Sequence, residues 1–442
     1  MNPCNIMVIG AGAGGMTAAA RAAECGAPVT LLEKTDSPGK KIRISGKYRC
    51  NVTNAAETDD FIRMYGPNGR FLYNALNRFS PGDVRDLLMR YGVETKVERG
   101  GRVFPVSDDA GDVVEAFRRY LEENRVIVRT GMPVREILVN QGRVTGVVTD
   151  GGTMPCEAVI LAAGGASFPD TGSTGDGYRI ARNCGHSIVP LRPALVPLIV
   201  KETALAERMQ NAILRNVRLT AWQGTAEEID TFAAPAHDYG RGIAGKKPPK
   251  KVIESRMGEM LITHFGIGGP ITLQMSLAVV DALKSGPVSV TIDLKPALSP
   301  ETLQARLQKD FDRYSKRSLR TILKEALPLK LIDTYIEAAG IPPDTQGCRI
   351  TGQERTRLVQ VVKGFRFTIE GPLPMTSAMV TAGGVALNEI DPRTMASRIV
   401  DGLFFCGEVI DIDAETGGYN LQAAFSTGYT AGESAAAFSK NR

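Results

Sequence analysis

Short, mostly apolar runs mark the beginning and the end of the chain, and each is followed by glycine or by polar residues. The runs lie at 6–9, 28–32, 158–161 and 403–406. Runs of this length are typical of strands that are buried in a sheet. An alanine-rich stretch, 16–25, separates the first two runs, and its composition favours a helix. The pattern therefore predicts a strand–helix–strand unit at the N-terminus and a return to the same kind of structure near the C-terminus.

Further elements follow from the spacing of apolar residues. We predict helices over 71–91, 110–124, 178–184 and 421–438, and strands over 126–128, 133–138 and 143–149. From residue 193 the pattern of apolar positions changes. Strand-like runs at 196–200, 217–222, 288–294 and 352–367 then surround one long helical stretch, about 300–340. This change predicts a second domain inserted into the first.

The composition is that of an ordinary globular protein. Of 442 residues, 43% are hydrophobic and 23% are charged, so the chain can build two or three domains with large cores. No apolar run approaches the roughly 18 residues that a membrane span requires, and no basic segment precedes the first apolar run. We therefore expect no membrane partner and a cytoplasmic location. The seven cysteines and three histidines are widely spaced, so we predict no metal site.

A glycine fingerprint follows the first apolar run directly. Gly10, Gly12 and Gly15 fit G-x-G-x-x-G, and Glu33 stands at the end of the second predicted strand. In such a turn the second glycine lets a pyrophosphate approach the backbone, while the helix N-terminus supplies N–H groups and partial positive charge. The acidic residue can accept hydrogen bonds from a ribose. The context predicts a dinucleotide site, for NAD or FAD; the alternative is a glycine-rich turn without a ligand.

A basic, glycine-punctuated stretch, 39–54, comes next, and it predicts an extended segment along an anionic ligand or, alternatively, a solvated loop. Its sequence, from Gly39-Lys40-Lys41 to Cys50-Asn51-Val52-Thr53-Asn54, resembles the signature of the BaiN/YhiN-like, aminoacetone-oxidase-like flavoproteins. Similar motifs recur at 100–107, 167–177, 258–270 and 407–422, so the resemblance covers nearly the whole chain. It implies FAD, bound non-covalently, in the N-terminal site.

The resemblance also implies a fold. We expect an α/β architecture: a Rossmann-like FAD-binding domain, with an inserted β-barrel that carries a small helical subdomain. The expected bounds are 1–194 and 364–442 for the FAD domain and 195–363 for the insert. The flavin is then expected where the two halves of the FAD domain meet, with the insert over one side of its ring.

The fingerprint and the resemblance together predict the residues that bind FAD. An acidic residue after the last strand can bind ribityl hydroxyls, the N-terminus of the final helix can face the flavin N1/C2=O edge, and a backbone group at Val134 can meet the adenine. We predict that Cys50 lines the FAD site. Cys50 and His264 are only remote candidates for covalent attachment of the flavin. The predicted residues are Gly10, Gly12, Ala13, Gly14, Gly15, Glu33, Lys34, Gly39, Lys40, Lys41, Ser45, Gly46, Arg49, Cys50, Asn51, Val134, Ala162, Gly164, Gly407, Glu408, Asp411, Gly418, Tyr419, Asn420 and Leu421.

The sequence assigns no catalytic residue, because no Ser-His-Asp or Cys-His arrangement is evident. The resemblance implies two activities on a small-molecule substrate: reduction of a conjugated C=C in a steroid-like or bile-acid-like enone, and oxidation of small amines with formation of hydrogen peroxide. We favour the reductase, with NAD(P)H as a transient reductant that needs no second fingerprint. A flavin-bearing electron-transfer or regulatory protein without a small substrate is a further alternative.

A nucleic-acid-associated flavoprotein is the alternative from another class. The segment 224–251 is longer and more polar than the family pattern, and it ends in a basic run, 245–251; a solvated loop is the simpler interpretation. A net charge of only +5 and few aromatic residues near that run disfavour a nucleic-acid partner. The sequence makes no prediction of the oligomeric state.

Overall fold

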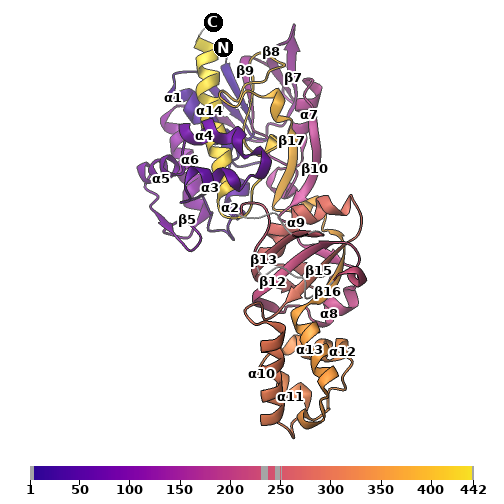
Figure 1. The fold of residues 1–442 in the computed structure, drawn as a ribbon. Coiled ribbons are helices and arrows are strands. Elements are labelled where there is room, and N and C mark those ends of the chain that lie inside the picture. The colour runs from indigo at the N-terminus through magenta and orange to yellow at the C-terminus, as the bar shows by residue number, and fades with distance from the viewer. Residues whose placement is uncertain (1–3, 230–236, 244–248, 250, 441–442) are drawn as a thin grey trace. The chain divides into compact units, whose positions relative to one another are not determined.

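The computed structural model describes residues 4–229, 237–243, 249 and 251–440. The chain forms two compact units, drawn in Figure 1. The discontinuous unit comprises Met1–Arg192 and Ala378–Arg442, and the inserted unit comprises Pro193–Ser377. Most of the basic run predicted at 245–251 lies outside the described residues. Within the described chain no helix has the length and apolarity that crossing a membrane requires.

A mixed sheet forms the centre of the discontinuous unit, in the order β6-β2-β1-β9-β8-β7, with β18 also paired to β9. The pairs β1–β2, β1–β9, β2–β6 and β9–β18 are parallel, so their carboxyl ends share one edge. The alternation of strand and helix in the sequence favours this topology. The strands are β1 (Cys4–Ile9), β2 (Val29–Leu32), β6 (Ile127–Arg129), β7 (Val134–Asn140), β8 (Arg143–Thr149), β9 (Gly152–Leu161) and β18 (Leu403–Phe405).

Two small-residue helices, α1 (Ala13–Glu24) and α14 (Tyr419–Lys440), pack backbone to backbone. A Cβ at Gly428 would lie 2.3 Å from the carbonyl oxygen of Gly14, and one at Gly432 would lie 2.3 Å from that of Ala18. The alanines and glycines of both helices are therefore a packing requirement. The remaining elements are α2 (Lys40–Ile44), α3 (Thr58–Arg63), α4 (Tyr73–Arg78), α5 (Pro81–Arg90), α6 (Ala110–Glu123) and α7 (Asp176–Asn183), the sheet β3 (Thr53–Asn54), β5 (Arg102–Pro105) and β4 (Thr95–Val97), and the pair β10 (Ile188–Ala194) and β17 (Val380–Val385).

The inserted unit contains a closed barrel in the order β11-β14-β13-β12-β15-β16. A helical part follows β15, and α8 (Thr203–Arg208) and α9 (Pro270–Leu283) complete the unit. The barrel strands are β11 (Leu198–Val200), β12 (Ile213–Gln223), β13 (Val252–Ile262), β14 (Gly266–Gly268), β15 (Val288–Asp293) and β16 (Phe365–Pro372); the helical part is α10 (Pro300–Arg313), α11 (Leu319–Leu323), α12 (Ile332–Ala338) and α13 (Gly352–Lys363). The predicted α/β fold with an inserted barrel and helical subdomain is confirmed.

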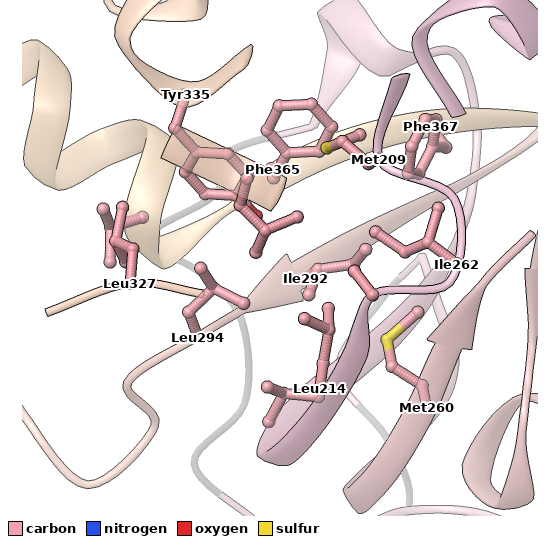
Figure 2. Close-up of a cluster of buried hydrophobic side chains, with 14 of the residues drawn as sticks. Met209, Leu214, Met260, Ile262, Ile292, Leu294, Leu327, Tyr335, Phe365 and Phe367 are labelled. Atoms are coloured by element: carbon pink, nitrogen blue, oxygen red, sulfur yellow. The ribbon is translucent and has the colours of Figure 1, made fainter. Parts of the chain in front are cut away.

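One hydrophobic core joins the barrel to its helical part (Figure 2). Ile262, Ile292 and Phe367 come from barrel strands, and Tyr335 comes from α12. The rings of Tyr335 and Phe365 stack, with centroids 4.6 Å apart and planes at 13°. Because aromatic pairs bury large apolar areas, this contact fixes the helical part on the barrel.

Four local predictions were wrong. The stretch 71–91 is not one helix, because Ser80 caps a new helix, α5, which begins at Pro81. The stretch 352–363 is helix α13, not strand, because Thr351 and Glu354 form a capping box at its start, so the helical part extends well beyond residue 340. Strand β16, from Phe365, pairs with β11 and β15 in the barrel, so the return to the discontinuous unit comes later than residue 364. The segment 39–54 is not extended throughout, because it contains the short helix α2.

Candidate functional site

The glycine turn after β1 shows three glycines with different roles. A Cβ at Gly10 would lie 2.6 Å from the carbonyl oxygen of Ala162, and one at Gly15 would lie 1.8 Å from that of Gly10. A Cβ at Gly12 would meet no atom of the described structure within 4 Å. Gly10 also has a φ of +98°, and its N–H donates to Leu32 O at 2.8 Å. Gly10 and Gly15 are thus required by the fold, whereas Gly12 borders open space.

The N-terminus of α1 adjoins that open space. Its N-cap is Gly12, which makes no side-chain capping bond, and its first turn holds no acidic residue. The first turn of a helix leaves N–H groups without intrahelical acceptors, so it favours an anion. Ala13 and Gly14 belong to this turn, although Gly14 also packs against α14: a Cβ there would lie 3.1 Å from Ala424 O. The turn fits the pyrophosphate of a dinucleotide.

Glu33 is buried at the end of β2 and is tied to the same turn. Its Oε2 accepts from Ala11 N at 2.7 Å and its Oε1 accepts from Thr35 N at 2.8 Å. Each carboxylate oxygen has a second lone pair, so the predicted contact with a ribose is compatible with these bonds. Its neighbour Lys34 instead pairs with Asp176 at 2.6 Å. Val134 is buried at the start of β7, and its contact with adenine stays a prediction.

The basic segment that begins at Gly39 makes two kinds of contact, one with the glycine turn and one with distant motifs. Gly39 has a φ of +72° and its N–H donates to Ala11 O at 2.9 Å, which anchors α2 beside the glycine turn. Lys40 pairs with Asp36. Lys41 Nζ lies 2.8 Å from Ser167 Oγ and 2.7 Å from Glu408 Oε2. Lys41 therefore joins two of the motifs that the sequence placed far apart.

Glu408 is the centre of a polar network. It accepts from Lys41 Nζ, from Thr381 N at 2.8 Å and from Ser167 Oγ at 3.3 Å. The cation and the backbone donor offset the cost of burying most of this carboxylate. Ser167 and Thr381 were absent from the predicted site. The motif at 167–177 was a signal for Ser167, but no local signal pointed to Thr381.

Ser45, Gly46 and Cys50 build a tight turn. Cys50 N donates to Ser45 O at 3.0 Å, and Gly46 has a φ of +58° with its Cβ position 2.8 Å from Asn51 N. The Cys50 side chain is fully buried, and burial raises the pKa of its thiol to about 12. The thiolate needed for covalent chemistry is thus disfavoured at neutral pH.

Arg49 and Asn51 differ in what they contact. Arg49 pairs with Glu98 and with Asp108, and its guanidinium lies 4.2 Å from the centre of the Phe104 ring. In the structure, Arg49 therefore stabilises the region of the small sheet β3–β5–β4 through these contacts. Asn51 Oδ1 is buried, and no donor within the described residues reaches it. A buried acceptor without a donor is costly, so this oxygen fits a donor group on a bound cofactor.

The carboxyl ends of β9 and β18, at the same edge of the sheet as the glycine turn, are followed by further predicted residues. Ala162 N donates to Ile9 O at 2.9 Å, and Gly164 has a φ of +71°. Gly407 N donates to Thr427 Oγ1 at 3.0 Å. Asp411 Oδ2 accepts from Asn68 Nδ2 at 3.1 Å. Burial raises the pKa of Asp411; Asn68 and Arg192 oppose the rise, and Asp413 adds to it.

The residues at the start of α14 are held mainly by the chain itself. A Cβ at Gly418 would lie 2.2 Å from Thr53 O. Tyr419 O accepts from Tyr65 Oη at 2.8 Å, and the amide of Asn420 bonds to both backbone groups of Ala414. Leu421 packs, partly buried, against the core of the unit. The predicted flavin contacts at this helix N-terminus stay predictions.

Gln422 is a buried residue that the site prediction omitted. Its Oε1 accepts from Thr53 Oγ1 at 2.6 Å, and its Nε2 donates to Phe79 O at 3.0 Å. It belongs to the motif at 407–422, so the sequence held a signal for it.

No group of three or more His, Cys, Asp or Glu side chains in the described chain is arranged to hold a metal ion.

Comparison with known proteins identifies the family. The HI0933-like protein Rossmann domain matches residues 4–434. The chain is 33% identical to the 3-dehydro-bile acid delta(4,6)-reductase of Clostridium scindens, over 98% of each protein. It is 30% identical to the ribosomal RNA dihydrouridine synthase of Escherichia coli over 97% of each, and 31% identical to that of Haemophilus influenzae over 96% of each.

Solved structures share the fold at low sequence identity. The 3-ketosteroid delta1-dehydrogenase of Sterolibacterium denitrificans superposes with a TM-score of 0.51 at 15% identity, covering 99% of this chain and 100% of that one. The E. coli quinol fumarate reductase FrdA gives a TM-score of 0.51 at 16% identity, covering 99% and 70%. From the match over nearly its whole length, the chain belongs to the HI0933-like family and, as the BaiN/YhiN-like resemblance implied, is an FAD-dependent oxidoreductase.

Proposed function

We propose that the protein is a reductase of a carbon–carbon double bond conjugated to a carbonyl group, in a steroid-like or bile-acid-like enone. The observation that carries the proposal is the full-length similarity to a bile acid delta(4,6)-reductase. We further propose that NADH or NADPH supplies the electrons and binds only transiently.

The chain's own residues prepare the site for FAD. Gly12 and the first turn of α1 receive the pyrophosphate, Glu33 accepts from a ribose, and Asn51 Oδ1 accepts from a donor of the cofactor. Lys41 pairs with Glu408 at 2.7 Å, which orients that carboxylate. When bound, the flavin supplies hydride chemistry at its N5. The structure assigns no side chain as the proton donor.

Uracil within RNA is the second candidate substrate. Two relatives of full length are ribosomal RNA dihydrouridine synthases. Dihydrouridine differs from uridine by two hydrogens across a C=C that is conjugated to a carbonyl, so both candidates need the same class of reaction. The net charge of +5 disfavours a nucleic-acid partner, but the similarity to these two relatives favours an RNA substrate.

Anaerobic reduction of the purified flavoprotein tests the proposal. We expect NADH or NADPH to bleach the flavin, and an added steroid enone to restore its colour. Restoration by a uridine-containing ribosomal RNA fragment, and not by the enone, would select the second candidate. If no nicotinamide nucleotide bleaches the flavin, but a primary amine does and oxygen then restores it with peroxide, the protein is an amine oxidase and the reductase proposal fails.

A further inference from the structure

We infer that the helical part of the inserted unit carries a surface that binds the phosphates of a structured RNA. The inference rests on the RNA candidate for the proposed function. Six cationic side chains form this surface, named here the basic stripe, and all six are exposed: Arg306, Lys309, Arg313, Lys316, Arg317 and Arg349.

The fold brings the six residues together. On α10, positions 306, 309 and 313 follow the helical spacing of three and four, so they share one face. The buried residues of this helix, Leu303, Leu307 and Phe311, occupy another face. After α10, Cys348 N donates to Ser315 O and Gly347 N donates to Arg317 O, both at 3.0 Å. These bonds place Arg349 beside Lys316 and Arg317.

The stripe lacks neutralising partners. Across the described residues, no carboxylate lies within ion-pair distance of any of the six side chains, whereas Arg320 pairs with Asp333 and Arg208 pairs with Glu337 nearby. A row of exposed, unpaired cations attracts a polyanion, because binding releases the counterions that surround it. The net charge of the whole chain is only +5 because acidic side chains elsewhere offset the positive charge of the stripe.

An aromatic ring at the centre of the stripe favours RNA over other polyanions. The Tyr314 ring has the guanidinium of Arg317 at 4.7 Å and that of Arg313 at 5.2 Å from its centre. The ring itself packs, partly buried, against the core, so it holds the guanidinium groups in place, and their exposed planes can stack on unpaired bases. The phosphates of a stem on the cations and an unpaired base near Tyr314 together describe an RNA stem with a single-stranded loop.

The test measures binding of a fluorescein-labelled RNA hairpin with a uridine-containing loop to the flavin-loaded protein at several salt concentrations. We compare the double variant Lys316→Gln/Arg317→Gln with the control double variant Lys284→Gln/Arg320→Gln. Both remove two positive charges from the inserted unit, but Lys284 and Arg320 are paired with Asp281 and Asp333. The stripe variant should bind about tenfold more weakly, and its slope of log K against log salt should fall by about 1.8, as expected for two lost phosphate contacts to a double-stranded stem.

A third variant and a second readout separate the outcomes. Tyr314→Leu should weaken binding of the hairpin but leave the salt slope unchanged, since it removes the ring that orients the guanidinium planes and removes no charge. NAD(P)H-dependent reduction of an enone should be the same in all variants. Equal RNA affinity of the stripe and control variants, or no RNA binding at low salt by an active reductase, overturns the surface and leaves the proposed function standing. Stripe-dependent RNA binding by a protein that lacks reductase activity supports the surface and overturns the proposed function.

Discussion

The chain begins two long helices with glycine, and the two turns differ in what the glycines face. Before α1, Gly12 borders open space, since a Cβ there meets nothing within 4 Å. Before α14, a Cβ at Gly418 would collide with Thr53 O at 2.2 Å, and Gly418 has a φ of +97°. The same pattern of sequence therefore leaves open space at one turn, where we propose that the pyrophosphate binds, and serves chain packing at the other.

The acidic residues beside the two turns differ in the same way. Glu33 bonds to backbone N–H groups at both of its carboxylate oxygens. Asp411 has an amide donor in Asn68, and burial together with the nearby Asp413 raises its pKa. Glu33 is thus held as an acceptor by two backbone N–H groups, whereas burial disfavours the charged form of Asp411 and raises its pKa. A glycine turn and a following acid do not define a site until their surroundings are known.

The variant Gly418→Ala should have the largest effect on folding. The left-handed backbone costs alanine about 1–2 kcal/mol, and the overlap with Thr53 O adds about 1–3 kcal/mol. We expect the free energy of unfolding to fall by about 3 kcal/mol, measured by urea denaturation of flavin-free protein. Gly371→Ala is the control, because a Cβ there meets no atom within 4 Å. Equal stability of the two variants would contradict the packing role.

The variant Gly12→Val should separate ligand binding from folding. Its φ of −81° suits any residue, so we expect flavin-free protein to remain folded and to lose about 1 kcal/mol at the helix cap. The branched side chain would occupy the space for the pyrophosphate, so FAD affinity should fall at least about 100-fold, measured by flavin fluorescence titration. Gly12→Ala should give an intermediate loss. A Gly12→Val protein that purifies fully flavinated would falsify the placement of the phosphates.

What the sequence could predict depended on how local the cause is. The spacing of Gly10, Gly12 and Gly15 lies within one turn, and the strands around it are short apolar runs, so the turn could be predicted from a local pattern. The helix over 352–363 was missed because the β-branched residues Val359, Val361 and Val362 near its end suggested a strand, although a capping box at Thr351 and Glu354 marks its start. The Lys41–Glu408 pair joins residues 367 positions apart, and the unsatisfied Asn51 Oδ1 depends on every neighbour. No local pattern specifies such contacts.

The variant Glu33→Ala should have a smaller effect on FAD than Gly12→Val. It removes the predicted ribose acceptor but leaves the phosphate turn in place. It also leaves Ala11 N and Thr35 N without their acceptor, which should lower the free energy of unfolding by about 1–3 kcal/mol. Glu33→Gln keeps one acceptor oxygen and should lie between. The idea that Glu33 serves both roles fails if Glu33→Ala changes neither FAD affinity nor the urea midpoint.

The variant Asp411→Asn should have the smallest effect, and its sign depends on pH. The pKa of Asp411 is raised above its usual value of 3.8 in the folded protein, first by burial and then by the charge of Asp413. The protonated carboxyl therefore stabilises the fold below pH 3.8, and this stabilisation is lost as the pH rises through the folded pKa. Asparagine cannot ionise and can still accept from Asn68. The melting temperature of the variant minus that of the wild type should thus increase from pH 4 to pH 8; Asp344→Asn, which also removes one carboxyl but at an exposed position, is the control for the loss of a charge. A difference for Asp411→Asn that falls with rising pH would mean that the fold stabilises Asp411 as a carboxylate, and the contrast between the two turns would be lost.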